Sequence, residues 1–578
     1  MKYPKLREIP TSREIVDVFK GYNHNLRIGN GEFYEMTNLS SDNYPLLSPR
    51  PKRGIYESPT KPQGMVAKDA LCYVDGSDFV INEYRVPMGL TVDNKPKTLI
   101  SMGAYVIIMP DKKYINTENH TDYGPIEAEI TTSDMVQFTL CKLDGEIYEN
   151  MVVSSTAPSA PNNMDLWIDT SETPNALKQY STTSAMWSTI ATTYIKISAT
   201  GIGKPFEVND GITIEGVDLV DDLNGSNVIW AKGDDYIVVK GILNHVESQL
   251  EPITISRKMP NMDFIIESEN RLWGCRYGVA LNGEIVNEIY ASKLGDFKNW
   301  NCFMGISTDS YAATVGTDGQ FTGAITHLGY PLFFKDNFIH KVYGNYPANY
   351  QIQTTACRGV QKGCSRSLSI VNEVLYYKSR SAICAYDGSL PVEISSALGD
   401  TPYGNAVAGT LGNKYYISMQ DDNGDYHLFV YDTKKGMWHR EDDTQAVDFC
   451  NCRGNLYLID YADNKIKTVR GTEGIAPDPI RWEAVTGILG TDSPDKKYIS
   501  RMDIRMSLEA GARVSFFAEY DSSGEWEHLY TTPPIEKLRT SAVPIKARRC
   551  DHLRLKIIGS GDAKIFSICK TTEQGSDI

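Results

Sequence analysis

The sequence predicts an all-β protein: a β-propeller of about six or seven blades, with an inserted β-rich domain and a C-terminal β-sandwich. Three observations lead to this prediction. Apolar and polar residues alternate with a period of two over much of the chain, and amphipathic helical stretches are almost absent. Tyr (34) and Gly (46) are abundant, which suits half-buried strands joined by tight turns. A hairpin pattern also recurs along the chain.

The recurring hairpin is an apolar-aromatic run, a polar turn and a second short strand. Its seven copies begin at Leu71, Tyr105, Leu272, Leu332, Leu375, Tyr415 and Leu456. The last four starts are separated by 43, 40 and 41 residues. Four-stranded propeller blades repeat at about 40–50 residues, so each of these intervals fits one blade.

One interval is far longer than a blade. The starts at Tyr105 and Leu272 are 167 residues apart, and removing one blade leaves roughly 120 residues, the size of an inserted domain. Composition changes in the same region, with a Ser/Thr/Pro-rich stretch over 154–163 and an acidic stretch beyond it. We therefore expect an insertion within the propeller.

The C-terminal region has a different β pattern. From residue 502 to 508 apolar residues alternate strictly with polar ones, and the alternation returns at 553–557, which predicts strands with one buried face. Short antiparallel strands over about 100 residues favour a sandwich. The predicted boundaries are an N-terminal arm at 1–55, propeller at 56–124, inserted β-rich domain at 125–250, propeller at 251–470 and C-terminal β-sandwich at 471–578.

Charge and composition exclude several classes of protein. The net charge is −15, so the chain lacks the basic footprint of a sequence-reading DNA-binding protein. We see no signal peptide and no apolar run long enough for a transmembrane helix. The 11 cysteines are scattered without zinc-ribbon spacing, which suggests mostly buried thiols in a chain made in a reducing cytoplasm.

No motif of catalysis stands out, so we expect no enzyme, no catalytic residue, no cofactor and no metal site. The glycines at 29–31 and 201–203 lack the rest of a phosphate-binding loop, and HExxH and GxSxG are absent. Asp421, Asn423 and Asp425 imitate the start of a calcium loop, but the following glycine and glutamate are missing. Asp-Asn-Gly between tyrosine-rich strands predicts a hairpin turn instead. A glycan-processing propeller stays a less favoured alternative, because sequence cannot give the distance between two carboxylates.

Three parts of the chain resemble one family of bacteriophage virion proteins, the tail nozzle, hub and packaged-DNA-stabilisation propellers. The N-terminal part has Phe19-Lys-Gly21-Tyr-Asn, an Asn38-bearing segment and Ser48-Pro-Arg-Pro-Lys-Arg-Gly54. The central part contains Gly295-Asp-Phe-Lys-Asn-Trp-Asn301, Gly316-Thr-Asp-Gly319 and Phe334-Lys-Asp-Asn-Phe. The C-terminal part has Tyr520-Asp-Ser-Ser-Gly-Glu-Trp526 and is similar to proteins from structural modules of phages of Gram-positive hosts.

This resemblance implies a structural protein of the neck or tail, found in the virion and forming a ring that closes or extends the DNA exit channel. Its partners would be copies of itself, other neck or tail proteins and the duplex DNA that passes through. Six copies are the expected number, although sequence does not decide between six and twelve. No membrane insertion is expected. The alternative is a tail-tip protein that binds a receptor or glycan.

Two sets of charged residues follow from the ring hypothesis. An acidic channel wall would repel the DNA backbone and let it slide, whereas a basic wall would hold it. The candidate channel-lining acids are Glu207, Asp210, Glu215, Asp218, Asp221, Asp222, Asp234 and Asp235. A solvated face is an equal alternative for these acids. The basic clusters would lie at protein–protein contacts; they are Arg50, Lys52, Arg53, Lys546, Arg548 and Arg549.

The insertion also contains two candidate glycan-stacking residues, Trp167 and Trp187. The stretch from Pro158 to Trp187 resembles a small Trp-containing unit of phage tail-associated proteins. Tryptophans of such a unit would stack on a sugar face. A core role for the pair is the favoured alternative, because a small β unit has little else to bury.

Overall fold

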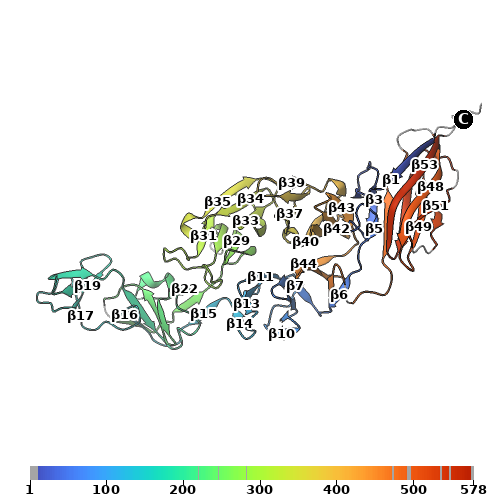
Figure 1. The fold of residues 1–578 in the computed structure, drawn as a ribbon. Helices are drawn as coiled ribbons and strands as arrows, with labels where there is room; N and C mark the ends of the chain where they lie inside the picture. The colour runs from blue at the N-terminus through green and yellow to red at the C-terminus, as the bar shows by residue number, and fades with distance from the viewer. Residues whose placement is uncertain are drawn as a thin grey trace, which may run out of the picture. The chain divides into compact units, whose positions relative to one another are not determined.

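The regular secondary structure of the chain is almost entirely β-strand (Figure 1). The computed structural model describes residues 11–574 apart from 219, 245, 281–282, 472–473, 491–495, 534–536 and 546–547. Over these residues there are 53 strands, four short 3₁₀ turns and no α-helix, which confirms the all-β prediction. None of the helical turns in this part of the chain is long enough to cross a membrane.

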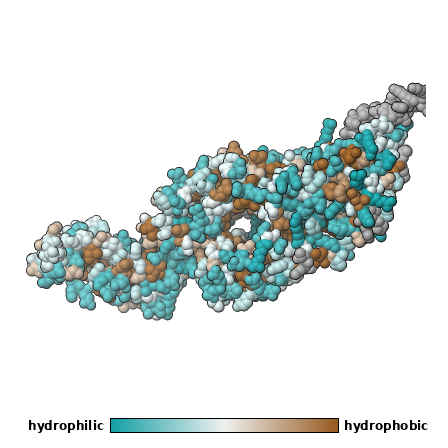
Figure 2. Space-filling view, in the orientation of Figure 1, coloured by the Kyte–Doolittle hydropathy of each residue, from teal (hydrophilic) through white to brown (hydrophobic). Residues whose placement is uncertain are grey.

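The chain divides into two compact units. The first comprises residues 1–99, 334–339 and 355–578, and the second comprises 100–333 and 340–354. Ten of the eleven cysteine side chains are buried, as predicted. On the face drawn in Figure 2, hydrophilic residues predominate and hydrophobic ones are scattered among them, the usual surface of a folded protein.

Seven four-stranded arrays, named sheets A to G here, repeat along the chain. Sheet A is β7 (Pro62–Ala67), β8 (Leu71–Asp75), β9 (Asp78–Ile81) and β10 (Tyr84–Val86). Sheet B is β11 (Thr98–Met102), β12 (Tyr105–Met109), β13 (Lys113–Asn116) and β14 (Tyr123–Pro125). Sheet C is β28 (Phe264–Ser268), β29 (Arg271–Val279), β30 (Ile285–Ala291) and β31 (Tyr311–Thr314). Sheet D is β32 (Phe321–His327), β33 (Tyr330–Lys335), β34 (Phe338–Tyr343) and β35 (Gln351–Ala356).

The remaining three arrays, like sheet A, lie in the first unit. Sheet E is β36 (Ser369–Val371), β37 (Val374–Lys378), β38 (Ile383–Tyr386) and β39 (Val392–Glu393). Sheet F is β40 (Gly404–Leu411), β41 (Lys414–Gln420), β42 (Tyr426–Asp432) and β43 (Met437–Arg440). Sheet G is β44 (Ala446–Cys452), β45 (Asn455–Asp460), β46 (Lys465–Thr468) and the N-terminal strand β6 (Gly54–Glu57).

Each of the seven hairpin starts found in the sequence lies on the second strand of a different array. These second strands are β8, β12, β29, β33, β37, β41 and β45. Most of their side chains are buried, and β8, β37 and β41 are buried on both faces. Within the first unit one apolar cluster joins sheets F and G and another joins G and A; within the second, clusters join B with C and C with D.

The N-terminal residues join strands that are distant in sequence. β2 (Gly21–Tyr22) pairs with the outer strand β43 of sheet F, and β3 (Glu32–Thr37) pairs with β47 (Arg481–Thr486). The result is a ten-stranded sheet that continues from sheet F through β2, β3 and β47 to β52 (Leu553–Ser560), β49 (Arg513–Tyr520) and β50 (Glu527–Thr531). A short pair, β4 (Leu39–Ser40) with β5 (Ser48–Pro49), precedes β6.

A second C-terminal sheet also takes an N-terminal strand. Its order is β1 (Thr11–Val16), β53 (Ala563–Gln574), β48 (Lys497–Leu508) and β51 (Arg539–Val543). The alternation predicted in this region is confirmed, since the apolar positions of β48 and β52 are all buried: Met502, Ile504, Met506, Leu508, Leu553, Leu555 and Ile557. Each of these two strands therefore has one buried face.

A glycine to alanine exchange tests the packing of this region. An ideal Cβ at Gly559 of β52 would lie 1.9 Å from Cε2 of Trp482, a side chain only 2% exposed. The indole cannot easily move, because its Nε1 donates to the Gly561 carbonyl at 3.0 Å. We expect G559A to lower the free energy of unfolding by about 1–3 kcal/mol. Urea unfolding should measure this loss. The control is G316A, because a Cβ on Gly316 would meet nothing within 4 Å. Gly511 is equally open, but its positive φ makes it a poorer control.

The insertion forms three sheets with their own cores. The first is β15 (Ala128–Thr131), β27 (Thr254–Arg257), β22 (Gly211–Glu215) and β23 (Gly225–Val228). The second is β24 (Ala231–Gly233), β25 (Tyr236–Lys240), β21 (Tyr194–Ser198), β16 (Val136–Cys141) and β26 (Glu247–Gln249). These two share one cluster of 17 buried hydrophobic residues.

A small module is nested within the insertion, between β16 and β21. It contains β17 (Met151–Ser154), β18 (Leu166–Asp169), β19 (Ala176–Ser181) and β20 (Met186–Thr189), with β17 and β18 parallel. Its core is small and consists of Leu166, Ile168 and Leu177 with Leu140 of β16.

Candidate functional site

Residues 19–57, which we call the clasp, make specific contacts with sheet F and with β47. Two glycines of the clasp touch neighbouring backbone so closely that a side chain would not fit. A Cβ on Gly21 would lie 2.3 Å from the Trp438 carbonyl oxygen, and one on Gly31 would lie 2.2 Å from the Val18 carbonyl oxygen. Both glycines have a positive φ. Gly21 therefore allows β2 to add to sheet F, and Gly31 allows the chain to pass close to Val18 just before β3.

Asn38 is the junction of the clasp. Its Nδ2 donates to the Arg481 carbonyl at 2.8 Å, and its backbone N–H donates to the Glu441 carbonyl at 2.5 Å. Its side-chain oxygen accepts from Nε of Arg50 at 2.8 Å. This one residue thus ties together the end of sheet F, the start of β47 and the Pro-Arg phrase of the same segment.

The two arginines of that phrase form a buried ion-pair network. Arg53 contacts Glu441 at 2.8 Å and Asp442 at 2.9 Å, and Arg50 contacts the same two carboxylates at 3.5 and 3.0 Å. Burial alone would raise the pKa of Asp442, but the charges of Arg53 and Arg50 outweigh it and lower the pKa to about 2. Arg50 and Arg53 therefore hold the clasp to the loop after β43.

This arrangement corrects the prediction that Arg50 and Arg53 lie at protein–protein contacts, because both side chains are used within the chain. Lys52 also binds internally, through the Ala476 carbonyl at 3.0 Å. In the C-terminal basic cluster Arg548 pairs with Glu527 at 2.6 Å, while Lys546 lies outside the described residues. Sequence reasoning missed the partners, since acids nearly 400 positions away give no local signal.

A second buried node joins the clasp to sheet F. Nζ of Lys414 donates to Ser40 at 3.0 Å and pairs with Asp42 at 2.9 Å. His439 of β43 is buried beside this ion pair, and burial together with the Lys414 charge lowers its pKa to about 3. The imidazole is therefore neutral in the folded protein at neutral pH.

The central segment that resembles virion proteins has a comparable structural role in the second unit. Asn299 donates from Nδ2 to Asp210 at 2.9 Å and to Asp296 at 2.5 Å, and its oxygen accepts from the Gly211 N–H at 2.8 Å. Arg257 forms a buried ion pair with the same Asp210. The network holds a loop of the insertion against the connection between β30 and β31 of sheet C.

The candidate channel acids divide into two groups. Asp210 is only 3% exposed and is neutralised by Arg257, so it does not present its charge to a channel, contrary to the prediction. The side chain of Asp221, in a 3₁₀ turn (Asp221–Leu223), lies outside the described residues. The others are exposed: Glu207, Glu215, Asp218, Asp222, Asp234 and Asp235. Of these, Glu207 lies 3.4 Å from Lys232.

The two tryptophans of the nested module contact each other edge-to-face, with ring centroids 5.4 Å apart. Trp167 is 5% exposed, its Nε1 donates to the Ser154 carbonyl at 2.9 Å, and Lys178 lies over its ring. Trp167 therefore has no free face for stacking on a sugar, contrary to the glycan hypothesis. The core of the module is so small that this ring is buried with it. Trp187 is half-buried, and its role in glycan binding stays a prediction.

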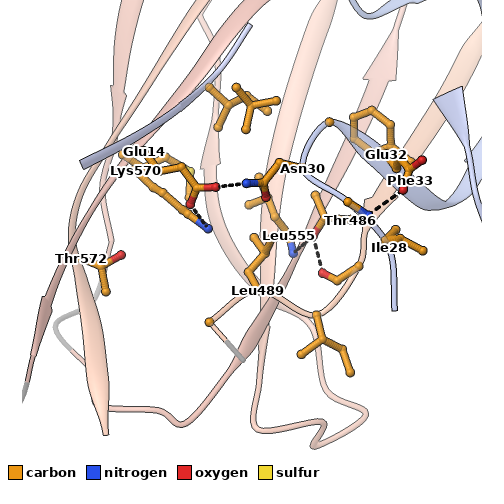
Figure 3. Close-up of a pocket in the computed structure, with 18 of the residues that line it drawn as sticks. Glu14, Ile28, Asn30, Glu32, Phe33, Thr486, Leu489, Leu555, Lys570 and Thr572 are labelled. Carbon is orange, nitrogen blue, oxygen red and sulfur yellow. Dashed lines mark hydrogen bonds and ion pairs between the residues drawn. The ribbon is translucent and has the colours of Figure 1, made fainter. Parts of the chain in front are cut away.

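A cavity of about 960 Å³ lies where β1, the loop around Asn30 and strands β48 and β53 meet (Figure 3). Two carboxylates line it, and both already have partners. Glu14 pairs with Lys570 at 2.7 Å and accepts from Asn30, and Glu32 accepts from the Gly29 N–H at 2.6 Å. These contacts hold the N-terminal strands to the C-terminal sheet, so we assign the cavity no chemistry.

The calcium-like stretch is the turn between β41 and β42, as predicted. Asp421 Oδ1 accepts the backbone N–H groups of Asn423 and Asp425 at 3.0 and 2.9 Å, and its other oxygen contacts His427 at 3.0 Å. Over the described residues, no group of three or more His, Cys, Asp or Glu is arranged to hold a metal ion.

Comparisons with known proteins assign no family. No protein-family model and no curated protein matches the chain. Among solved structures, Raptor of Chaetomium thermophilum is similar at 10% identity with a TM-score of 0.29, over 72% of this chain and 29% of Raptor. U3-55K is similar at 6% identity with a TM-score of 0.27, over 72% of this chain and 98% of U3-55K. An exo-β-1,3-galactanase of Phanerochaete chrysosporium is similar at 9% identity with a TM-score of 0.22, over 53% of this chain and 94% of the galactanase. Scores this low support no inference about fold or function.

Proposed function

We propose that this protein is a structural component of a bacteriophage neck or tail, in which copies form a ring that closes or extends the DNA exit channel. The observation that carries the proposal is the structural role of the residues that resemble those of virion proteins. Gly21, Asn38, Arg50 and Arg53 hold strands together, and Asn299 anchors the insertion. The resemblance therefore rests on residues that build an architecture, which is what a virion scaffold requires.

We also propose that sheets A to G are the seven blades of one propeller and that the two C-terminal sheets form a sandwich. Four pairs of arrays share apolar clusters: F with G, B with C, C with D, and the last array, G, with the first, A. Strand β6 from the N-terminus completes sheet G, which is how a ring of blades is closed by pairing the two ends of its sequence. The alternating burial of β48 and β52 supports two facing sheets.

In the proposed ring the six exposed acids of the insertion would face the channel, because negative charge keeps the DNA backbone from binding to the wall. The ring would have six copies and would contact other neck or tail proteins. The protein would reside in the virion and would need no cofactor.

Electron microscopy of the purified full-length protein tests this proposal. We expect closed rings with cyclic symmetry, and weak binding of duplex DNA at physiological salt because the protein carries a net charge of −15. Mass photometry of the same sample would count the copies. Monomers at all concentrations, or tight and salt-sensitive DNA binding, would contradict the proposal.

A further inference from the structure

A second cavity, of about 470 Å³, lies in the first unit beside sheet E. Its walls come from the β37–β38 turn, the 3₁₀ turn Ser396–Leu398 and the segment up to Tyr403. All of its lining residues belong to the described part of the chain. The cavity is large enough for a monosaccharide-sized molecule.

Lys378 of β37 lines this cavity and is 4% exposed. Its Nζ donates to Oε1 of Gln361 at 3.0 Å and to the Ser379 carbonyl at 2.6 Å. Both acceptors are neutral, and no described carboxylate lies within ion-pair distance of this ammonium group. An ammonium group has three N–H donors, so one remains for a ligand.

A buried cation without a counter-charge is costly. Burial lowers the pKa of Lys378 accordingly, and only the buried thiols of Cys364 and Cys384, whose own pKa values burial raises, act in the opposite direction. An anion in the cavity would supply the missing charge and accept from the third N–H group.

The other charged residues of the cavity are compatible with an anion. Arg380 is exposed at the cavity and makes no ion pair with a described residue, so it is available to a second oxygen of the same ligand. Glu393 is already paired with Arg358 at 3.0 Å. Asp400 is exposed, so water screens its charge.

We propose that this cavity binds a small oxyanion, the carboxylate or phosphate group of a sugar-sized molecule, through Lys378 and Arg380. This inference does not depend on the proposed ring function, since every contact lies within one chain.

Isothermal titration calorimetry of the full-length protein with inorganic phosphate and with D-glucuronate tests the proposal and distinguishes the two oxyanions. We expect saturable binding of at least one probe, weakened about tenfold or more in K378M, the usual loss for a charged hydrogen bond. The matched control is K362M, which removes an exposed lysine from the same region and should bind as the wild type does. Absence of binding of both probes, or equal binding by K378M, would overturn the proposal.

A second variant covers the case in which K378M does not fold. Arg380 is exposed, so R380M should fold. We expect R380M to weaken binding of the same probe several-fold, because it removes the second cation of the site. Wild-type affinity in R380M would refute the site.

Discussion

Replacing Arg53 by methionine should lower the free energy of unfolding by about 3 kcal/mol or more. The exchange keeps much of the side-chain volume but removes the charge that contacts Glu441 at 2.8 Å and Asp442 at 2.9 Å. Glu441 and Asp442 would then share only Arg50 in a buried setting. Removing one partner of a buried network costs more free energy of unfolding than removing one partner of a surface pair. Urea unfolding followed by tryptophan fluorescence measures the change.

The matched control is R470M. Arg470 pairs with Asp42 at 2.7 Å, but its side chain is 53% exposed, so we expect a loss of at most about 1 kcal/mol. R53K, which keeps the charge but not the two-pronged geometry, should fall between the two. Equal stabilities of R53M and R470M would show that the clasp network does not stabilise the fold.

Acidification should destabilise the protein through His439. Its folded pKa of about 3 lies below the unfolded value near 6.5, so the unfolded chain binds the proton more readily. The stabilising contribution is therefore complete above pH 6.5 and is lost as the pH falls toward 3. Between pH 7 and pH 4 this one residue should account for a loss on the order of 3 kcal/mol.

The test compares the pH dependence of unfolding in the wild type and in H439L. The variant cannot take up the proton, so its free energy of unfolding should fall less steeply between pH 7 and pH 4. H528Q, at an exposed histidine, should keep the wild-type slope. Identical slopes for the wild type and H439L would mean that His439 titrates alike in the folded and unfolded chains.

The sequence predicted much of the local structure of this protein. The starts of the seven hairpins, the alternation of Met502 to Leu508 and the hairpin turn at Asp421 all appear as expected. These features depend on neighbours within about ten residues, because the period of the side chains and the turn chemistry are local properties.

Charged and aromatic residues were harder to interpret from sequence. Asp210 looked like one of eight similar acids, yet among those whose side chains are described it alone meets Arg257 and Asn299 in a buried network. Arg50 and Arg53 were expected at protein–protein contacts, and for Trp167 a core role was favoured over stacking on a sugar. The type of a charged or aromatic residue does not indicate whether the fold will place a partner beside it.

The sequence by itself thus determined the strand content, the repeating hairpins and the faces that are buried in the C-terminal strands. Only the tertiary structure decided what the N-terminal residues do. β1 pairs with β53, β2 with β43, β3 with β47 and β6 with β46, all between segments more than 400 positions apart. Such pairing depends on backbone groups that every residue carries, so which strand meets which is settled by the packing of the whole chain and leaves no pattern in either segment alone.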